Sequence, residues 1–466
     1  MQTFLNIVST IYSLLWGDLF TIPLPGGGSI GISLLVAILI PAGIYFTIRT
    51  RFLPIRLFPE MLRISVERQA GDKGALSGMQ ALIVSTATRV GMGNMVGVVA
   101  AISAGGAGAV FWMWVTALIG CSTAYVEATL AQICNEKDPL YGGLRGGPAY
   151  YIHRFFAKSR VVKRYSLVAV LFALSGLLCW CGVSQVISNS VSSAFYNAFQ
   201  IPPIVSTVIL VVLAAVIVLR KNTTVKVLDT IVPIMAVFWF GLAIFVIVKN
   251  AGLLPAMFRQ IFEEAFGLRQ MAAGGFGAAL MNGVKRGLFS NEAGSGSAPC
   301  AAAAADVSHP AKAGLFQAFG VFIDTIIICS CTAFIILLAP QEAISGLEGM
   351  ELLQTAMGCH FGNIGIYFTA ITLWLFSFST FIGILYYARS NVAYLFGDNW
   401  TSQTIYKIVA LVMLFIGGLA AYTFVWDLGD IGIALMTVFN MIVLIPMSGR
   451  AIRALDEYTA LPKDQR

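Results

Sequence analysis

Runs of about 20 apolar residues, separated by short polar stretches, recur along this chain from residue 30 to residue 449. A helix needs roughly 20 such residues to cross the hydrocarbon core of a bilayer, so each run predicts one membrane span. The runs predict eleven helices, at 30–49, 80–104, 107–133, 165–190, 201–219, 228–248, 273–305, 313–339, 363–388, 403–421 and 427–449. We therefore expect an all-α integral membrane protein in which residues 1–466 form a single domain.

The composition agrees with this interpretation and excludes a water-soluble protein. Of the 466 residues, 58% are hydrophobic and 11% are charged, whereas about a quarter of the residues in ordinary soluble domains are charged. The first 20 residues contain no basic region and no small-residue cleavage site. We expect them to form a retained, partly amphipathic lead-in instead of a signal peptide.

Lysine and arginine predict the orientation of the helices in the membrane. These residues concentrate in every second loop, most densely at 49–78 and 134–164. Loops rich in basic residues stay in the cytoplasm. The partition fits an odd number of spans, with the N-terminus outside and residues 450–466 as a cytoplasmic tail. Because the basic residues are spread over many loops, the net charge of +7 does not indicate nucleic-acid binding.

Three further basic residues, Arg89, Lys285 and Arg286, lie inside apolar runs. A charge at the centre of a bilayer costs roughly 2.5 to 3.5 kcal/mol, so we expect these side chains to face protein instead of lipid. Each belongs to a glycine-rich segment, at 88–97 or at 283–297. Such segments predict unwound helices, and unwound backbone at this depth occurs where it lines a cavity or meets other protein groups.

The two glycine-rich segments are about 200 residues apart in the chain, with five predicted spans between them. One therefore lies on an inward-to-outward helix and the other on an outward-to-inward helix, which is the relation of an inverted-topology repeat. Transporters of that kind place half-helix N-termini beside a substrate carboxylate and exposed carbonyls around the coupling cation. A free amino acid suits such a site because its carboxylate takes backbone N–H groups and its ammonium takes carbonyls. The site needs no fixed counter-charge.

A purely structural explanation of these segments stays open. Glycines also allow helices to pack closely, and Arg89 or Arg286 would then pair with Glu127 or Glu292. This explanation suffices for any single glycine, but it is weaker for the two clusters together.

At these residues the chain resembles the alanine or glycine:cation symporters, which are bacterial and archaeal plasma-membrane proteins of the amino-acid and polyamine transporter superfamily. The matching motifs are RVGMGNMVGVVAAISAGGAGAVFWMW at 89–114, GGPAYYI at 146–152, GVKRGLFSNEAGSGSAP at 283–299, HPAKAGLF at 309–316, GVFIDT at 320–325 and LFSFSTFIG at 375–383. The resemblance implies a bacterial inner-membrane protein that imports small neutral amino acids, such as alanine or glycine, together with sodium. It implies alternating access, no cofactor, no resident metal and no enzymatic activity.

The same resemblance implies a fold like that of the bacterial leucine transporter, with two inverted repeats of five helices. The repeats would be residues 80–248 and 273–449. Residues 1–79 would be a lead-in with one extra leading helix. The broken helices then become the first helix of each repeat.

The resemblance also assigns residues to a substrate site. The unwound amides at the first break and the residues on facing helices would surround the amino acid. The implied residues are Gly91, Met92, Gly93, Asn94, Gln185, Phe289, Ser290 and Ile384. Phe289 and Ser290 are expected at the second break, where the aromatic ring would cover the substrate. Gln185 has the alternative role of a hydrogen bond between packed helices.

A sodium site is implied by hydroxyl groups on the helix at 363–388. Ser379 and Thr380 would bind the ion together with Val90 and Asn94 of the first broken helix. Sodium is a hard cation that prefers oxygen ligands. Taken alone, a serine or threonine in a membrane helix usually bonds to its own backbone, so this assignment depends on the resemblance.

Two positions depart from the pattern of the family. Many members have threonine where Met92 stands and tryptophan where Ile384 stands. Both changes remove a polar or bulky group near the expected site and predict a larger or less polar cavity. The hypothesis that follows is a substrate larger than alanine or glycine, such as glutamine or a branched neutral amino acid.

Other functions remain as alternatives. Proton coupling in the same fold would require Glu127 or Asp324 to titrate inside the membrane. A channel usually needs a symmetric filter built from repeated motifs, which two unlike broken helices do not provide. The three histidines, expected in loops, form no acid–base or metal constellation in the sequence. The cysteines at 179, 181, 329 and 331 are expected to be buried small side chains.

Overall fold

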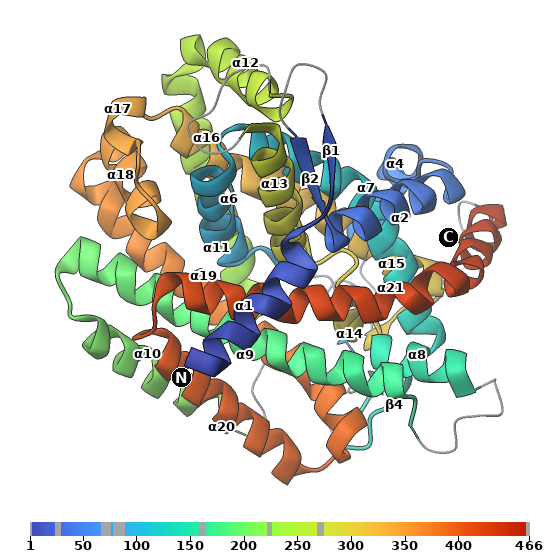
Figure 1. Cartoon of the computed structure of the whole chain (residues 1–466). Helices are drawn as coiled ribbons and strands as arrows, with labels where there is room; N and C mark the ends of the chain where they lie inside the picture. The colour runs from blue at the N-terminus through green and yellow to red at the C-terminus, as the bar shows by residue number, and fades with distance from the viewer. Residues whose placement is uncertain are drawn as a thin grey trace.

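The computed structural model describes residues 2–23, 29–66, 76–77, 89–140, 142–157, 165–220, 226–267 and 275–462. These residues are mostly helical, as the sequence predicts (Figure 1). Within the described residues, six helices are long and apolar enough to cross a membrane, or seven if the two helices that meet at residue 250 with a bend of 76° form one span. Shorter apolar helices lie at Leu34–Arg49, Gly93–Gly105 and Pro203–Val218.

The chain begins with a helix and a β-hairpin. Helix α1 (Gln2–Trp16) packs on the last helix of the chain, and the Trp16 indole donates to the Asp430 carbonyl at 3.0 Å. Strands β1 (Asp18–Pro23) and β2 (Ser29–Ser33) pair in antiparallel orientation. Because β2 occupies the start of the predicted helix at 30–49, helix α2 begins at Leu34 and runs to Arg49.

The first half of the chain continues with short elements and then with longer helices. The short ones are α3 (Leu53–Arg56), α4 (Phe58–Val66), β3 (Leu76–Ser77), β4 (Glu136–Lys137) and β5 (Leu144–Arg145). The helices are η1 (Gly93–Gly97, a π-helix), α6 (Val98–Gly105), α7 (Gly108–Ile133), α8 (Pro148–Ala157), α9 (Leu167–Phe199), α10 (Pro203–Val218) and α11 (Lys226–Lys249). Most of the N-terminal part of the predicted helix at 80–104 lies outside the described residues.

The second half has the same helical character. Its elements are η2 (Ala251–Leu253), α12 (Leu254–Ala265), α13 (Gly275–Asn291), α14 (Pro299–Ala302), β6 (Ala305–Asp306), α15 (Pro310–Val321), η3 (Phe322–Cys329, a π-helix), α16 (Ser330–Leu337), α17 (Gln341–Ile344), α18 (Gly349–Phe361), α19 (Asn363–Phe396), α20 (Trp400–Gly417) and α21 (Tyr422–Ala460). Strand β6 pairs in parallel with β3, and β4 pairs with β5.

Helices α12 and α18 stand where the sequence was expected to form loops. Both are shorter than a membrane span and amphipathic, so a search for 20-residue apolar runs does not detect them. Helix α12 caps its neighbour, because the buried Glu264 carboxylate accepts the Ala107 amide at 2.7 Å, just before α7. Helix α18 buries Met350, Leu353 and Met357 against the bundle.

The distribution of polarity is that of a membrane protein. Large apolar side chains are exposed along α10, α11 and α20, as at Val212 (54%), Phe238 (62%) and Ile405 (57%). By contrast, Arg89 and Glu127 are buried. Apolar groups on the outside and charges on the inside suit a lipid environment.

Two long helices form the centre of the packing. Figure 1 shows α21 and α9 running side by side across the molecule, and α9 also contacts α19 and α20. Glycines permit the close approach: a Cβ atom on Gly182 would stand 2.6 Å from the amide nitrogen of Gly429. Helices α9 and α21 also supply part of the lining of the candidate site described below.

Candidate functional site

The second glycine-rich segment contains a break between α13 and α14. Helix α13 continues through Asn291, and residues 292–298 are not helical. Backbone φ is +58° at Glu292, +99° at Gly294 and +86° at Gly296, values that residues with a side chain rarely adopt. The prediction that the break includes Phe289 and Ser290 is therefore corrected: both belong to the last turn of α13.

Two glycines of this segment serve close packing instead of unwinding. A Cβ atom on Gly283 would stand 2.4 Å from the Trp112 Cβ, and one on Gly287 would stand 2.5 Å from the Thr116 hydroxyl. Both glycines lie inside α13 and face α7. The structural explanation thus holds for these two positions, while Gly294 and Gly296 form the break.

The break is held in place by a buried carboxylate. Glu127 of α7 accepts the Gly294 amide through Oε2 at 3.0 Å and the Asn440 side-chain amide through Oε1 at 2.5 Å. Asn440 also donates to the Gly294 carbonyl at 3.0 Å and accepts the hydroxyl of Tyr151. Helices α7, α8 and α21 are thereby all joined to the non-helical segment.

The first glycine-rich segment is built by a side chain. The Asn94 Oδ1 accepts the Gly91 amide at 3.0 Å and closes a tight turn, after which η1 leads into α6. Gly91 and Gly93 do not have a positive φ. The glycines here provide room: a Cβ atom on Gly93 would contact the Ser290 Cα at 3.4 Å.

The two glycine-rich segments meet at Asn94. Its Nδ2 lies 3.3 Å from the Ser290 hydroxyl and 2.8 Å from the Asp324 carboxylate, with the Asp324 carbonyl and the Cys329 sulfur also in reach. Ser290 itself donates to the other Asp324 oxygen at 2.9 Å. Two amide protons cannot serve all four acceptors at once. The cluster is therefore rich in acceptor oxygens, a composition that suits a small hard cation.

Both π-helical segments carry a residue of this cluster. Asn94 lies in η1 and Asp324 in η3, and the two segments are in contact. Short π-helical insertions are frequently found at functional sites. From the sequence, Asp324 was considered only as a possible proton carrier or ion-pair partner. Its position beside Asn94 depends on the fold and could not be predicted.

A small cavity of about 20 Å³ lies where the segments meet. Its volume is enough for one water molecule, so it has no room for an amino acid in this structure, and we call it the closed cavity. Five predicted residues line it: Met92, Gly93, Phe289, Thr380 and Ile384. The lining residues that the sequence did not assign are Cys179, Trp180, Val183, Glu292, Ser297 and Ile433. The helix at 165–190 was expected beside the site, but its apolar pattern alone does not show which of its side chains reach the cavity.

The other predicted residues lie near the cavity without lining it. The Gln185 side-chain amide contacts the Met413 sulfur at 3.3 Å, which joins α9 to α20. The Thr380 hydroxyl accepts the Met92 amide at 3.2 Å and donates to the Phe376 carbonyl, while Ser379 also donates to Phe376 at 2.8 Å. The Asn94 Nδ2 group donates to Asp324. Gly91, Val90 and Ser290 are buried.

The buried basic residues face protein groups, as predicted, but their partners are not the carboxylates that the structural alternative named. Arg286 makes a bidentate ion pair with Asp430, both distances being 2.9 Å, and Lys285 joins it at 3.2 Å. Arg89 donates to Gln317 at 2.9 Å. The described structure shows neither arginine paired with Glu127 or Glu292. Sequence reasoning could not find Asp430, since it lies 144 residues from Arg286.

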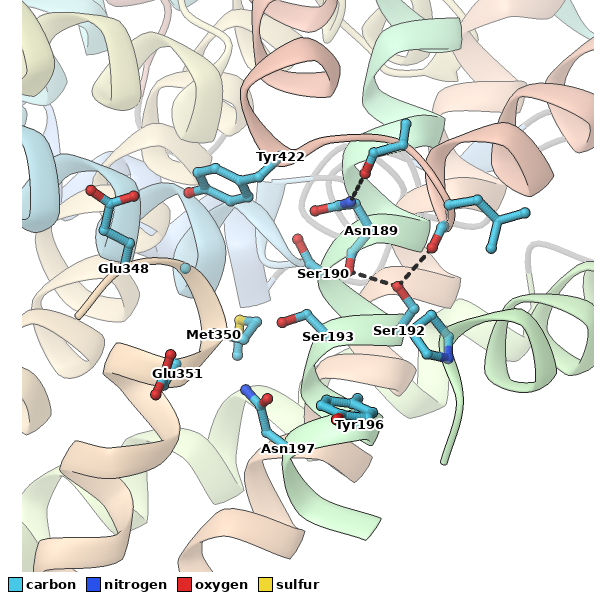
Figure 2. Close-up of a pocket in the computed structure, with 15 residues that line it drawn as sticks. Asn189, Ser190, Ser192, Ser193, Tyr196, Asn197, Glu348, Met350, Glu351 and Tyr422 are labelled. Carbon is cyan, nitrogen blue, oxygen red and sulfur yellow. Dashed lines mark hydrogen bonds between the residues drawn. The ribbon is translucent and has the colours of Figure 1, made fainter. Parts of the chain in front are cut away.

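A larger cavity, of about 580 Å³, opens between α9, the start of α18 and the turn before α21. Figure 2 shows Glu348 and Glu351 on one side of it and Ser190 and Ser193 of α9 on the other. None of its described lining residues is basic. A third cavity, of about 180 Å³, shares Glu348 and Tyr422 with it.

The third cavity is linked to the closed cavity by a chain of interacting side chains. It is lined by Lys285, Arg286 and Asp430, and the Arg286 guanidinium lies 3.8 Å from the centre of the Trp426 ring. The same ring stands 4.9 Å from that of Phe289, which lines the closed cavity. Trp426 therefore connects the lining of the third cavity to Phe289 of the closed cavity.

A sequence profile of the sodium:alanine symporter family matches residues 27–466. The chain belongs to this family. It is therefore a membrane transporter and not an enzyme, which confirms the resemblance seen in the motifs. The family is sodium-coupled, and the several apolar helices of the structure agree with a multi-pass membrane protein.

Named relatives cover most of the chain. A probable sodium/glutamine symporter, GlnT of Bacillus subtilis, is 43% identical over 92% of this chain and 88% of its own length. The sodium/alanine symporter AgcS of Methanococcus maripaludis is 32% identical over 99% of both chains. Among solved structures, a manganese transporter of Eremococcus coleocola matches 85% of this chain and 80% of its own with a TM-score of 0.52. Since the sequences are 12% identical, that likeness concerns the fold alone.

Proposed function

We propose that this chain is a symporter that imports small neutral amino acids with sodium by alternating access. The observation that carries the proposal is the contact between the two glycine-rich segments, in which Asn94 bonds to Ser290 196 residues away beside a closed cavity. Backbone and side-chain polar groups converge there inside an apolar bundle. A site of this kind binds a small polar solute and shields it from lipid.

The proposed architecture has eleven membrane spans. Residues 80–248 and 273–449 are two inverted repeats of five helices, preceded by one extra helix. The N-terminus is outside and residues 450–466 are in the cytoplasm, as the distribution of basic residues favours. Beside the helices of full span length, the described residues form shorter apolar helices at Leu34–Arg49, Gly93–Gly105 and Pro203–Val218, which are proposed to supply further spans.

The substrate is proposed to be alanine, glycine or glutamine. The names of the relatives include a glutamine symporter and an alanine symporter. Met92 and Ile384 both line the cavity, where many family members carry threonine and tryptophan. The smaller Ile384 leaves room that supports glutamine as well as alanine.

The backbone of the first glycine-rich segment is proposed to hold the substrate carboxylate. The amides of Gly91, Met92 and Gly93 lie at the start of the η1–α6 helical segment, and helix N-termini attract anions. In this structure the Gly91 amide donates to Asn94 Oδ1 at 3.0 Å. The Met92 amide already has the Thr380 hydroxyl as its partner at 3.2 Å. Phe289 is proposed to cover the substrate. Gln185 and Ser290 are proposed to support the residues that line the site.

Sodium is proposed to bind beside this backbone. The Ser379 and Thr380 hydroxyls and the Val90 carbonyl supply oxygen ligands on one side. On the other side Asn94 supplies its amide oxygen, in contact with the Asp324 cluster. Asp324 supports a cation here because its carboxylate has neutral partners, Asn94, Ser290 and Thr325.

The same observation supports proton coupling as a second candidate. A buried carboxylate that bonds to neutral groups can take up a proton when no cation is bound. Glu127 is a weaker candidate because it holds the Gly294 amide. Sodium remains the first choice because the family is sodium-coupled.

The test is uptake of radiolabelled alanine, glycine and glutamine by proteoliposomes at fixed pH. We expect uptake of at least one of them under an inward sodium gradient, and a loss of about tenfold or more when choline replaces sodium. Undiminished uptake in choline would overturn sodium coupling. Failure of all three substrates in the wild type would overturn the substrate class. A panel of unlabelled amino acids then ranks the cargo, and inhibition by glycine and alanine alone would exclude glutamine.

A further inference from the structure

Glu292 is the first residue of the second break and one of the residues that line the closed cavity. Among the described lining residues it is the charged one; the others are apolar, hydroxyl-bearing, sulfur-bearing or glycine. The Glu292 side chain is 9% exposed. The buried residues that line this cavity therefore include one carboxylate and no other charged side chain among the described residues.

One oxygen of this carboxylate is open. Oε2 of Glu292 is buried and has no hydrogen-bond partner among the described residues. The structure shows no ion pair for it either, since Arg89 bonds to Gln317 and Arg286 pairs with Asp430. Burying a carboxylate oxygen without a partner is unfavourable, so the site is built to receive a donor that the closed structure does not contain.

The backbone conformation of Glu292 is also unusual. Its φ is +58°, a left-handed conformation that is uncommon for residues other than glycine, asparagine and aspartate. Such strain is found mainly where surrounding structure imposes it, often at binding sites. The neighbouring Gly294 is fixed by Glu127, which holds the segment in the geometry that turns Glu292 toward the cavity.

We infer that Glu292 binds the ammonium group of the transported amino acid. The substrate would lie across the cavity, with its carboxylate at the amides of Met92 and Gly93 and its ammonium at Oε2 of Glu292. Met92, Gly93 and Glu292 all line the same cavity. This inference rests on the proposed function and replaces the expectation that the site needs no fixed counter-charge.

The assignment has a consequence for specificity. A fixed carboxylate at one end selects solutes that carry an ammonium and disfavours simple carboxylic acids. It also disfavours acidic side chains, because a second carboxylate would approach Glu292. Neutral α-amino acids satisfy both ends of the site at once, whatever their side chain.

The test uses the full-length protein in proteoliposomes with Glu292→Gln, which keeps the size of the side chain and removes its charge. We expect the alanine concentration for half-maximal uptake to rise at least tenfold, while the sodium concentration for half-maximal uptake changes less than twofold. Glu292→Asp should restore part of the affinity. Glu342→Gln, an exposed residue of α17, is the control for loss of a carboxylate and should match the wild type.

A second measurement keeps the inference testable if Glu292→Gln does not fold. In the wild type, we expect unlabelled ethylamine to inhibit alanine uptake more strongly than propionate does, because ethylamine has the ammonium alone. Inhibition by propionate equal to that by ethylamine would overturn the inference. So would an unchanged half-maximal alanine concentration in Glu292→Gln, or a shift in the sodium curve alone, which would make Glu292 a cation ligand. If the wild type transports no amino acid, the proposed function fails, a result separate from these.

Discussion

The two glycine-rich segments were expected to be counterparts, yet they are built differently. At residues 91–97 a side chain closes the turn, since Asn94 accepts the Gly91 amide. At residues 292–298 the backbone itself leaves the helical region, with positive φ at Glu292, Gly294 and Gly296. There the stabilising contact comes from another helix, through Glu127.

This difference predicts which substitutions each segment can tolerate. The first segment passes through a turn into a π-helix and continues as α6, so it keeps helical hydrogen bonds close to the cavity. The second is an irregular stretch whose shape depends on glycine conformations and on contacts from α7 and α21. We expect substitutions of the glycine backbone to damage the second segment and substitutions of one side chain to damage the first.

The largest effect is expected for Gly296→Ala. A Cβ atom there would stand 2.7 Å from the Pro148 ring and 2.9 Å from the Phe172 ring, and φ is +86°. Backbone strain of about 1 to 3 kcal/mol adds to a similar cost for overpacking. The variant should show a markedly lower Tm in detergent, or no folded protein by size-exclusion chromatography.

Gly97→Ala is the matched control in the first segment. The nearest atom to its Cβ would be Phe289 Cδ1 at 3.6 Å, and its φ is not positive. Its Tm should stay close to that of the wild type. Equal losses of stability in Gly97→Ala and Gly296→Ala would show that the two segments do not differ as described.

Glu127→Ala should have the next largest effect. The change leaves the buried Gly294 amide without its acceptor, and each such unsatisfied group costs about 1 to 3 kcal/mol. We expect a lower Tm and uptake reduced at least tenfold. Glu127→Gln, which keeps a carbonyl oxygen for one of the two donors, should recover part of the stability. A wild-type Tm for Glu127→Ala would contradict the role given to this carboxylate.

Ile384→Trp should act mainly on selectivity, with the smallest effect on the uptake of alanine. Ile384 lines the closed cavity between the two segments. The larger indole ring of tryptophan would therefore reduce the space for the substrate side chain. We expect glutamine uptake to fall at least tenfold relative to alanine uptake, a difference of about 1.4 kcal/mol. The measurement is uptake of both labelled amino acids by the same proteoliposomes. A parallel loss of both would place Ile384 outside the selective part of the site.

Much of the fold could be predicted from local patterns. Apolar runs of span length indicated the long helices, and α7, α9 and α19 lie within or extend the predicted ranges. Helices α12 and α18 were missed because they are short and amphipathic. The β1–β2 hairpin was missed because the apolar residues of β2 continue directly into the apolar run of α2.

Part of the site could also be predicted, in this case from sequence motifs instead of apolar runs. Motif residues such as Met92, Gly93 and Phe289 do line the cavity, because the motifs mark where helices break. Asp430 as the partner of Arg286, and Trp180 as part of the lining, depend on packing between distant helices. A hydropathy pattern carries no information on which of the buried carboxylates faces which arginine, so it could not show that the alternative pairing with Glu127 or Glu292 does not form.

The central claim is that the two segments form one site through Asn94 and Ser290. It is tested most directly by a double-mutant cycle on sodium-driven alanine or glutamine uptake, with Asn94→Ala, Ser290→Ala and the combined variant in proteoliposomes. Because the two side chains are in contact at 3.3 Å, residues that act together should show non-additive losses. We predict that the double variant loses little more activity than the more damaging single variant. Fully additive losses, with all variants folded, would contradict the account.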